Sequence, residues 1–237
     1  MARKAKTKPG KVSMQDLRKL VNQKAGRNVA HNLTEANPTE VKDWIPTGSR
    51  WLASIICKGQ LAGIPVGKIT EIAGLTSTGK SYMAAQIAAI WDSLALTPAI
   101  SDVEGDFNPQ SSMAVKARIL AKGMSKITLP IADKQATLLV LNQLKDNITS
   151  GPLARITAMT TPYVTPGGKA LVYSYSLRIW LTGRKAKSAF VLDDKGYRVG
   201  SEVKVRIEKS RFGTQGRNCA FRIMWGSVDI GVRDEES

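Results

Sequence analysis

The stretch KITEIAGLTSTGKSYMAAQIAA, residues 68–89, holds three local signals whose order decides the fold. Residues 68–73 alternate in side-chain character and are bounded by glycines, which predicts a β-strand. Residues 82–89 predict a helix, and between the two, residues 74–81 match the pattern G-x-x-x-x-G-K-[ST] at every fixed position. A strand, this loop and a helix in that order predict the phosphate-binding loop of an α/β nucleotide-binding core.

Each fixed position of the loop has a chemical task. Its glycines let backbone N–H groups surround a β-phosphate, the Lys80 ammonium reaches the β and γ oxygens, and the Ser81 hydroxyl is a ligand for Mg²⁺. The following helix directs its N-terminal dipole at the phosphates. The predicted nucleotide-binding residues are Gly74, Leu75, Thr76, Ser77, Thr78, Gly79, Lys80 and Ser81.

Composition points to a polyanionic partner. The 237 residues include 35 Lys and Arg against 19 Asp and Glu, a net charge of +16, which favours binding to nucleic acid or to an anionic membrane surface. There is no apolar run near the ~18 residues of a spanning helix and no signal peptide, so we expect a cytosolic protein. Cys57 and Cys219 lack metal-ligand spacing and are expected to be reduced, buried thiols.

The N-terminal region, residues 1–45, is expected to be separate from a core at residues 46–237. Five cations in residues 3–11 form an arm that is either a solubilising tail or disordered until it meets an anion. A short amphipathic helix follows, with a capping-box-like start at Ser13 and a stop at Gly26. The sequence leaves open whether this helix docks on its own core or on another subunit.

Downstream patterns predict a nucleic-acid interface. Residues 113–124 have helical spacing, and residues 136–143, ATLLVLNQ, read as a strand buried on both faces. Residues 145–168 have no core-like periodicity, and a loop this long is usually functional or disordered. Residues 170–181, 201–210 and 218–226 read as further strands.

Several segments resemble the RecA recombinase family, most closely its phage UvsX-type branch. They are IPTGSRWLASIICKGQLAGIPVGKITEIAGLTSTGKS (45–81), WDSLALTPAISDVEGDFNPQSSMAVKARILAKGMSKI (91–127), TLLVLNQLKDNI (137–148), TPGGKALVYSYSLRIWLTGRK (165–185) and GSEVKVRIEKSRFG (200–213). The similarity spans about residues 46–226 in the correct order. It implies an α/β fold: a RecA-like P-loop ATPase core with a mostly parallel, here truncated, central sheet.

The resemblance also implies a function. That function is ATP-dependent assembly on single-stranded DNA as a homo-oligomeric helical filament, followed by homologous pairing and strand exchange, with ATP and Mg²⁺ as cofactors. Further partners would be phage or host replication and recombination proteins, no membrane is involved, and the location would be the cytoplasm of a bacterial or phage-infected cell.

The family's functional roles carry over to matching positions. Lys80 holds ATP, Asp92 contacts Mg²⁺ together with Ser81, and Gln143 senses the γ-phosphate. Lys209 and Arg211 complete the site on the neighbouring subunit's ATP, as arginine fingers do. By the resemblance, the family's first DNA-binding loop matches residues 101–109 and its second follows Gln143. The implied DNA-binding residues, in or beside these two DNA loops, are Met113, Arg118, Lys145, Arg155, Tyr163, Gly167 and Gly168. An ordinary turn is the competing explanation for the two glycines.

One departure from the family concerns hydrolysis. Ten residues separate Ser81 from Asp92, where a βαβ unit commonly takes ~30 residues. We therefore expect that a helix, a turn and the next parallel strand do not fit between them. We expect the segment with the family's catalytic glutamate to be missing, and the residues before Asp92 to continue the helix or form a strand. Glu104 is the one substitute base, although its position aligns with the first DNA loop. The alternatives are a non-hydrolysing nucleic-acid-binding remnant and a helicase-type ATPase, and the DNA-loop motifs argue against the latter.

Overall fold

The computed structural model describes residues 13–26, 30, 40–57, 63–87, 90–91, 109–148, 151, 154–183, 187–225 and 230–234. The chain divides into two compact units, residues 1–40 and residues 41–237. Three sequence predictions fall outside the described residues: the basic arm over residues 3–11, Asp92 and Glu104. Within the described ranges, the helices are all too short or too polar to cross a membrane.

The first unit contains helix α1, Met14–Ala25, as the sequence predicts. The hydroxyl of its N-cap, Ser13, accepts a hydrogen bond from a backbone N–H of the first turn, a donor that has no partner within the helix. The helix ends at Gly26, whose φ of 64° is the left-handed conformation that glycine adopts without strain. Its apolar side chains are all at least 40% exposed: Met14, Leu17, Leu20 and Val21.

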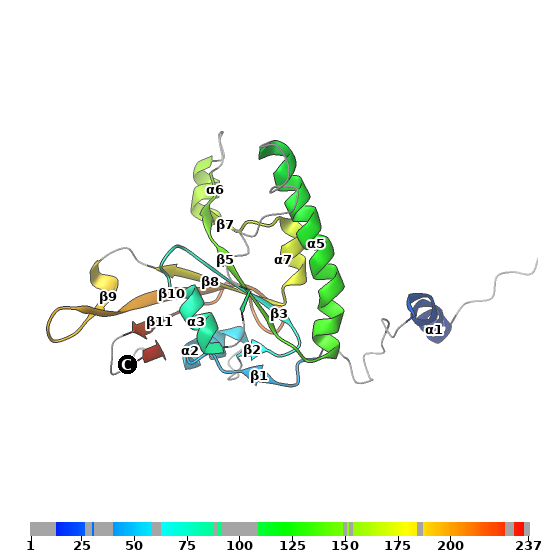
Figure 1. The fold of residues 1–237 in the computed structure, drawn as a ribbon, viewed down its shortest axis with the longest axis horizontal. Helices are drawn as coiled ribbons and strands as arrows, with labels where there is room; N and C mark the ends of the chain where they lie inside the picture. Colours follow the sequence, from blue (N-terminus) through cyan, green and yellow to red (C-terminus); the bar gives the residue numbers. More distant parts are fainter. Residues whose placement is uncertain are drawn as a thin grey trace, which may run out of the picture. The chain divides into compact units, whose positions relative to one another are not determined.

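The second unit is built on one large β-sheet with helices on both faces (Figure 1). Its helices are α2 (Arg50–Ile56), α3 (Lys80–Ile87), α5 (Pro109–Asp133), α6 (Ala154–Thr160), α7 (Lys169–Ser174) and the 3₁₀ helix η2 (Lys187–Ala189). The strands of the large sheet are β3 (Ile69–Gly74), β4 (Ile90–Trp91), β5 (Leu138–Gln143), β8 (Leu177–Gly183), β9 (Phe190–Leu192), β10 (Arg198–Ser210), β11 (Asn218–Trp225) and β12 (Ile230–Arg233). Two small pairs are β1 (Trp44–Ile45) with β2 (Ile64–Pro65), and β6 (Lys145–Asp146) with β7 (Tyr163–Val164).

The large sheet is mixed, which corrects the prediction of a mostly parallel sheet. Its strand order is β12-β11-β10-β8-β3-β5-β4, with β9 paired to β10. The neighbours among β4, β5, β3 and β8 are parallel, whereas β10 is antiparallel to β8 and β11, and β11 to β12. For β10 and β11 the reason is a short connection: residues 211–217 join them, and a parallel crossover needs a dozen residues or more.

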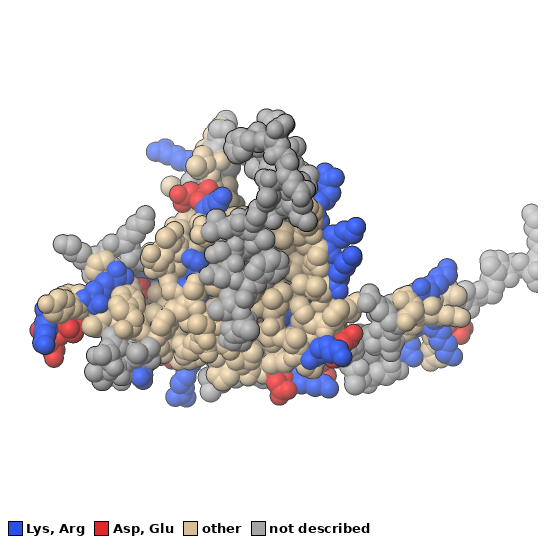
Figure 2. Space-filling model, viewed as in Figure 1, with Lys and Arg blue, Asp and Glu red and all other residues tan. Residues whose placement is uncertain are grey.

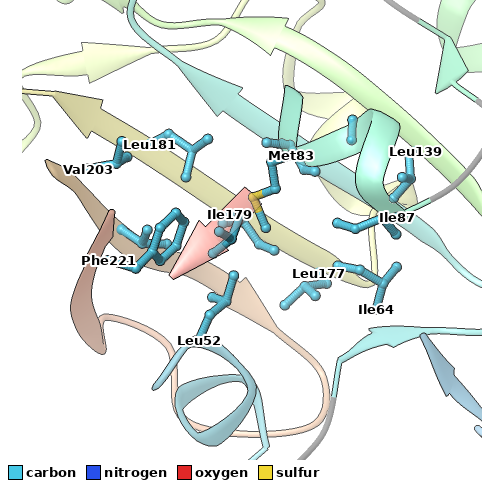
Figure 3. Close-up of a cluster of buried hydrophobic side chains, with 14 of the residues drawn as sticks. Leu52, Ile64, Met83, Ile87, Leu139, Leu177, Ile179, Leu181, Val203 and Phe221 are labelled. Atoms are coloured by element: carbon cyan, nitrogen blue, oxygen red, sulfur yellow. The ribbon is translucent and has the colours of Figure 1, made fainter. Parts of the chain in front are cut away.

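Each face of the sheet carries its own hydrophobic cluster. On one face, Ile179 and Leu139 pack with Leu52 of α2 and Met83 of α3 (Figure 3). On the other face, Ile69 and Val140 pack with Met124 of α5 and with residues of and beside α7. Strand β5 supplies buried side chains to both clusters, so the predicted doubly buried strand is confirmed.

The end of β12 is tied to the start of α2. Asp234 accepts hydrogen bonds from the backbone N–H groups of Arg50 at 2.6 Å and Trp51 at 3.3 Å, and from the hydroxyl of Ser49, the N-cap of α2. A carboxylate at this position pairs the unsatisfied donors of the first turn and complements the helix dipole. This clasp joins residues 185 positions apart in sequence.

The crossover from α3 to β4 is short because both elements are short. α3 has eight residues and ends at Ile87, and β4 has two residues, which pair in parallel with Leu139 and Val140 of β5. The residues directly before Asp92 therefore form a strand and do not continue the helix. The expectation that a helix, a turn and a strand do not fit between Ser81 and Asp92 is therefore wrong, because α3 and the described part of β4 are short enough to fit.

Two segments differ from their predicted local structure. The described part of residues 145–168 contains regular elements: β6 and β7 pair with each other, and α6 lies between them at the tip (Figure 1). These elements are too short to show a sequence period. Residues 169–174 form helix α7 where a strand was predicted, because Leu171 and Tyr175, four positions apart, are both buried in the second cluster.

Candidate functional site

The loop between β3 and α3 turns through two left-handed residues. Ser77 and Gly79 have φ values of 62° and 78°, and α3 begins at Lys80. The Thr78 hydroxyl and the Lys80 ammonium both donate to the carbonyl oxygen of Leu75, each at 2.8 Å. The lysine side chain therefore lies back over the loop that precedes it.

The glycines of this loop stand where a side chain would not fit. A Cβ on Gly74 would lie 2.6 Å from the Thr78 hydroxyl oxygen and 2.7 Å from the Leu181 carbonyl oxygen, and a Cβ on Gly79 would meet Ile223. The loop, with a cation over it and a helix start behind it, fits the requirements of a phosphate group. The exposed Ser81 supplies one hydroxyl for Mg²⁺, while its expected carboxylate partner, Asp92, lies outside the described residues.

The structure brings Gln143 to this loop. Gln143 is the last residue of β5, and its register partner on β3 is Gly74, the first residue of the loop. The next residue, Leu144, donates its backbone N–H to the Gly74 carbonyl at 3.1 Å. The end of β5 and the start of the loop therefore lie side by side, and the nucleotide-sensing role of Gln143 stays a prediction.

Lys209 and Arg211 lie at the other end of the strands. On β8, Leu181 pairs with Gly74 at the loop end, whereas Leu177 pairs with both Thr70 and Ser210. Four strand residues, about 13 Å, separate the two levels. In this chain, the two cations donate to backbone carbonyls at the end of α7: Lys209 to Val172 at 2.6 Å and Arg211 to Tyr173 at 3.0 Å. Burial, with the nearby charges of Arg211 and Arg178, lowers the pKa of Lys209.

The predicted DNA-binding residues lie on α5 and on the segment 145–168. Arg118, Lys122 and Lys126 recur every four residues on α5 and are exposed, and Figure 2 shows cations gathered along this side of the molecule. Lys145 and Arg155 are exposed on β6 and α6. The Met113 side chain lies outside the described residues, although its backbone is part of α5.

Tyr163 and the glycine pair have distinct surroundings. Tyr163 is half-buried on β7. Gly167 and Gly168 have φ values of 110° and 79° and form the turn into α7, where a Cβ on Gly167 would meet Leu171. The positive φ values fit a tight turn, and the contact of these glycines with DNA stays a prediction.

Sequence reasoning missed a pocket of about 560 Å³ between the α6–β7 segment and the antiparallel half of the sheet. The residues that line it include Tyr163, Trp180, Thr182, Lys204, Arg206 and Asn218. Lys204 and Arg206 are exposed, so an aromatic wall and two solvent-facing cations meet here. The alternation of basic and apolar residues in VKVRIEKS was the available signal.

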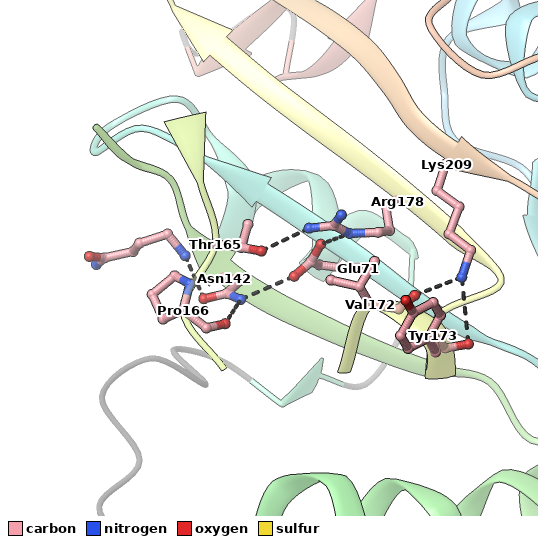
Figure 4. Close-up of polar contacts among 9 residues, drawn as sticks. Glu71, Asn142, Thr165, Pro166, Val172, Tyr173, Arg178 and Lys209 are labelled. Atoms are coloured by element: carbon pink, nitrogen blue, oxygen red, sulfur yellow. Dashed lines mark hydrogen bonds and ion pairs between the residues drawn. The ribbon is translucent and has the colours of Figure 1, made fainter. Parts of the chain in front are cut away.

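Sequence reasoning also missed a buried polar network beside the loop. Glu71 of β3 is fully buried and accepts hydrogen bonds from Arg178 of β8 at 2.5 Å and from Asn142 of β5 at 3.0 Å (Figure 4). Arg178 also donates to the Thr165 hydroxyl at 2.8 Å, and Asn142 to the Pro166 carbonyl at 3.1 Å. The signal was a glutamate within the mainly apolar strand that precedes the loop.

The sheet with helices on both faces places the chain among α/β proteins, and its sequence gives the family. The RecA N-terminal domain family matches residues 87–230, more than half of the chain, and the protein belongs to the RecA family. Protein RecA of Ureaplasma parvum serovar 3 is 26% identical over 251 residues, covering 79% of this chain and 71% of that protein. Protein RecA of the Wolbachia of Culex pipiens is 23% identical over 265 residues, covering 83% and 70%. Protein RecA of Fusobacterium nucleatum is 31% identical over 137 residues, covering 57% and 32%.

The Ureaplasma protein contains aligned residues that this chain lacks. The part of this chain in the Ureaplasma alignment, 79% of 237 residues, is about 187 residues, which is about 64 fewer than the 251 aligned positions. The alignment therefore includes a substantial number of positions in the relative that have no counterpart here.

Proposed function

We propose that the protein is an ATP-dependent, single-stranded-DNA-binding recombinase that assembles with copies of itself into a helical filament and pairs homologous strands. The observation that carries the proposal is the register pair of Gly74 and Gln143. The first residue of the loop Gly74–Ser81 is thereby the neighbour of the strand end that leads, through Leu144, into segment 145–168. A bound nucleotide and bound DNA would then act on two adjacent strand ends.

ATP is the proposed occupant of the loop Gly74–Ser81. The Lys80 ammonium would leave the Leu75 carbonyl and turn to the β and γ oxygens, and the Ser81 hydroxyl would bind Mg²⁺. Mg²⁺, when bound, neutralises charge on the phosphates. Gln143, at the neighbouring strand end, would respond to the γ-phosphate.

Single-stranded DNA is the proposed partner on the basis of charge and aromatic content. The row of Arg118, Lys122 and Lys126 offers successive cations at about 6 Å of helix rise, as phosphate contacts require. The pocket with Tyr163 and Trp180 joins aromatic walls to cations, a combination that suits bases and backbone together.

A second copy of the chain is part of this proposal. Because Lys209 and Arg211 lie about 13 Å along the strands from their own loop, they are poorly placed to act on the nucleotide of the same chain. The loop of a neighbouring copy is the proposed target. ATP binding and filament assembly would then be thermodynamically coupled.

Weak hydrolysis is the second candidate: a protein that binds ATP and DNA but turns ATP over slowly. Two observations favour it. Only two residues lie between the end of α3 at Ile87 and the start of β4 at Ile90, and the Ureaplasma relative contains aligned residues with no counterpart here. Both support the absence of the strand that carries the family's catalytic glutamate.

The test is fluorescence anisotropy of a labelled single-stranded oligonucleotide, with and without a non-hydrolysable ATP analogue, at two salt concentrations. We expect the analogue to tighten binding and higher salt to weaken it steeply, because many counterions are released. Affinity that is independent of both would contradict the proposal. Unwinding of a tailed duplex would favour a helicase instead.

A further inference from the structure

Glu71 is an acidic residue in the centre of the sheet, on the face that carries α5, α7 and segment 145–168. Every residue of β3 is buried, and the Glu71 side chain is fully so. It lies three residues before Gly74 and matches no position of the phosphate-loop pattern. On its face of the sheet it lies between the hydrophobic residues Ile69 and Ala73 of the same strand.

Both carboxylate oxygens of Glu71 have partners on the flanking strands. Oε1 accepts from Asn142 Nδ2 of β5, and Oε2 accepts from Arg178 Nε of β8. The carboxylate therefore links three adjacent strands, β5, β3 and β8. Figure 4 shows the side chains converging across the sheet.

The two partners extend the network to the segment 145–168 and to Gln143. Arg178 Nη2 donates to the Thr165 hydroxyl, and Asn142 Nδ2 donates to the Pro166 carbonyl. Asn142 Oδ1 accepts the backbone N–H of Gln143 at 2.9 Å. Glu71 is thus linked to Thr165 through Arg178, and to Pro166 and Gln143 through Asn142.

This arrangement is costly if its only task is stability. Burial raises the pKa of the Glu71 carboxyl, while the Arg178 charge and the hydrogen bonds of Arg178 and Asn142 lower it in part. Replacement of a buried ion pair by packed apolar side chains is often neutral or stabilising. The presence of Glu71 and Arg178 in the core is better explained if they hold the side chains around them in defined positions.

We propose that Glu71, acting through Asn142 and Arg178, is a positioning residue that fixes the returning end of segment 145–168 relative to Gln143 and thereby couples nucleotide binding to DNA affinity. The inference rests on the proposed function, which supplies the two ligands. Glu71 touches neither of them. Its effect is on the ratio of DNA affinities with and without nucleotide.

The principal test compares the wild-type protein with Glu71→Gln, which keeps the shape and removes the charge. The probes are a labelled single-stranded oligonucleotide and a non-hydrolysable ATP analogue, and thermal unfolding verifies that each variant is folded. We expect a wild-type ratio of at least about fivefold and a Glu71→Gln ratio near one, with nucleotide affinity within about threefold of wild type. Glu40→Gln, which removes an exposed carboxylate, should keep the wild-type ratio.

Two variants at Thr165 test the same coupling if Glu71→Gln does not fold. Thr165→Val keeps the shape and loses the hydroxyl that Arg178 contacts, whereas Thr165→Ser keeps the hydroxyl. We expect the logarithm of the DNA-affinity ratio to fall by at least half in the valine variant and to stay at the wild-type value in the serine variant. A merely structural role would lower the melting temperature and leave the ratio unchanged.

Three results would overturn the inference. The first is a folded Glu71→Gln protein that keeps the wild-type ratio, and the second is a Thr165 pair that keeps it in both variants. The third is a wild-type protein that binds DNA equally well with and without nucleotide. That result overturns the coupling but not the proposal that the protein binds DNA. A wild-type protein that binds neither probe contradicts the proposed function, and the inference with it.

Discussion

Lys80 and Arg211 lie toward opposite ends of the same sheet. Lys80 follows the end of β3 at Gly74, whereas the backbone N–H of Arg211 donates to Ser176, immediately before β8 begins. Because β3 and β8 are parallel and in register, the two levels are separated by the length of the strands. If both cations act on one phosphate group, two copies of the chain must supply them.

Arg211→Ala is expected to reduce nucleotide-dependent self-association at least tenfold, as measured by sedimentation velocity with the ATP analogue. Its exposed contact with the Tyr173 carbonyl should cost less than about 1 kcal/mol of stability. Lys195→Ala, in an exposed turn, is the matched control. Mixing Arg211→Ala with Lys80→Ala should restore assembly in about a quarter of the interfaces, because head-to-tail contacts can then combine an intact loop with an intact arginine. A mixture that is no better than either variant would count against action between copies.

Lys80→Ala is expected to weaken nucleotide binding by about 1.5–3 kcal/mol, because a charge-assisted contact to phosphate is lost. This is a tenfold or greater rise in Kd, measurable by titration with a fluorescent nucleotide. Lys122→Ala, on the exposed row of α5, should leave nucleotide affinity unchanged. Equal affinities for wild type and Lys80→Ala would mean that the loop is not a nucleotide site.

ATP hydrolysis stimulated by single-stranded DNA is expected to be very low. A positioned general base contributes ~10²–10⁴-fold, and the short connection from α3 to β4 leaves no room for the family's glutamate-bearing strand. Phosphate release with and without DNA is the measurement, on material whose intact mass matches the sequence. Robust stimulated turnover would refute this expectation, and loss of that turnover in Glu104→Gln would then identify the substitute base.

Two glycine-to-alanine variants should change stability in opposite directions. In Gly74→Ala, the new Cβ would meet the Leu181 carbonyl of the neighbouring strand, so we expect a loss of about 1–3 kcal/mol in urea unfolding. In Gly123→Ala, the Cβ on α5 meets no atom within 4 Å, so removal of a helical glycine should stabilise the protein by about 0.5–1 kcal/mol. Equal effects at both positions would contradict the described packing of the loop.

Cys219 is expected to react slowly with iodoacetamide in the folded protein. Burial, with the nearby charge of Asp234, raises the pKa of its thiol from 9.0 to about 12, so the thiol is almost wholly protonated at pH 8. The loss of thiolate outweighs the higher nucleophilicity that accompanies a higher pKa. Alkylation at pH 8, followed by mass spectrometry of the Cys219 peptide, should be at least tenfold slower than in urea-unfolded protein and should accelerate with each unit of pH. Equal rates would show that the thiol is not shielded.

The elements that the sequence predicts best are those with strong local signals. The pattern around Gly74–Ser81 predicts the strand, loop and helix in the right order, and the apolar run before Gln143 predicts β5. The helix stop at Gly26 is confirmed, because this glycine has the left-handed backbone conformation that ends a helix. These signals depend on a few consecutive residues and little on tertiary contacts.

The parts that sequence reasoning missed depend on contacts between distant residues. The Glu71 network joins residues 71 and 107 positions apart, and a single glutamate in a strand does not name its partners. Helix α7 was missed because the alternation Y-S-Y-S mimics a strand, while burial of Leu171 and Tyr175 against α5 decides for a helix. The direction of β10 relative to β8 follows from tertiary pairing and has no local signature.

The clasp between Ser49 and Asp234 determines when α2 can become stable during protein synthesis. A ribosome that adds ~5–20 residues per second needs on the order of 10–40 s to pass from one residue to the other. Throughout that interval the first turn of α2 lacks the carboxylate that pairs its backbone donors. α2 also lacks much of the surface on which it packs, since Phe221 and Val232 belong to the same cluster. The first helix of the second unit is therefore among the last parts of that unit to become stable.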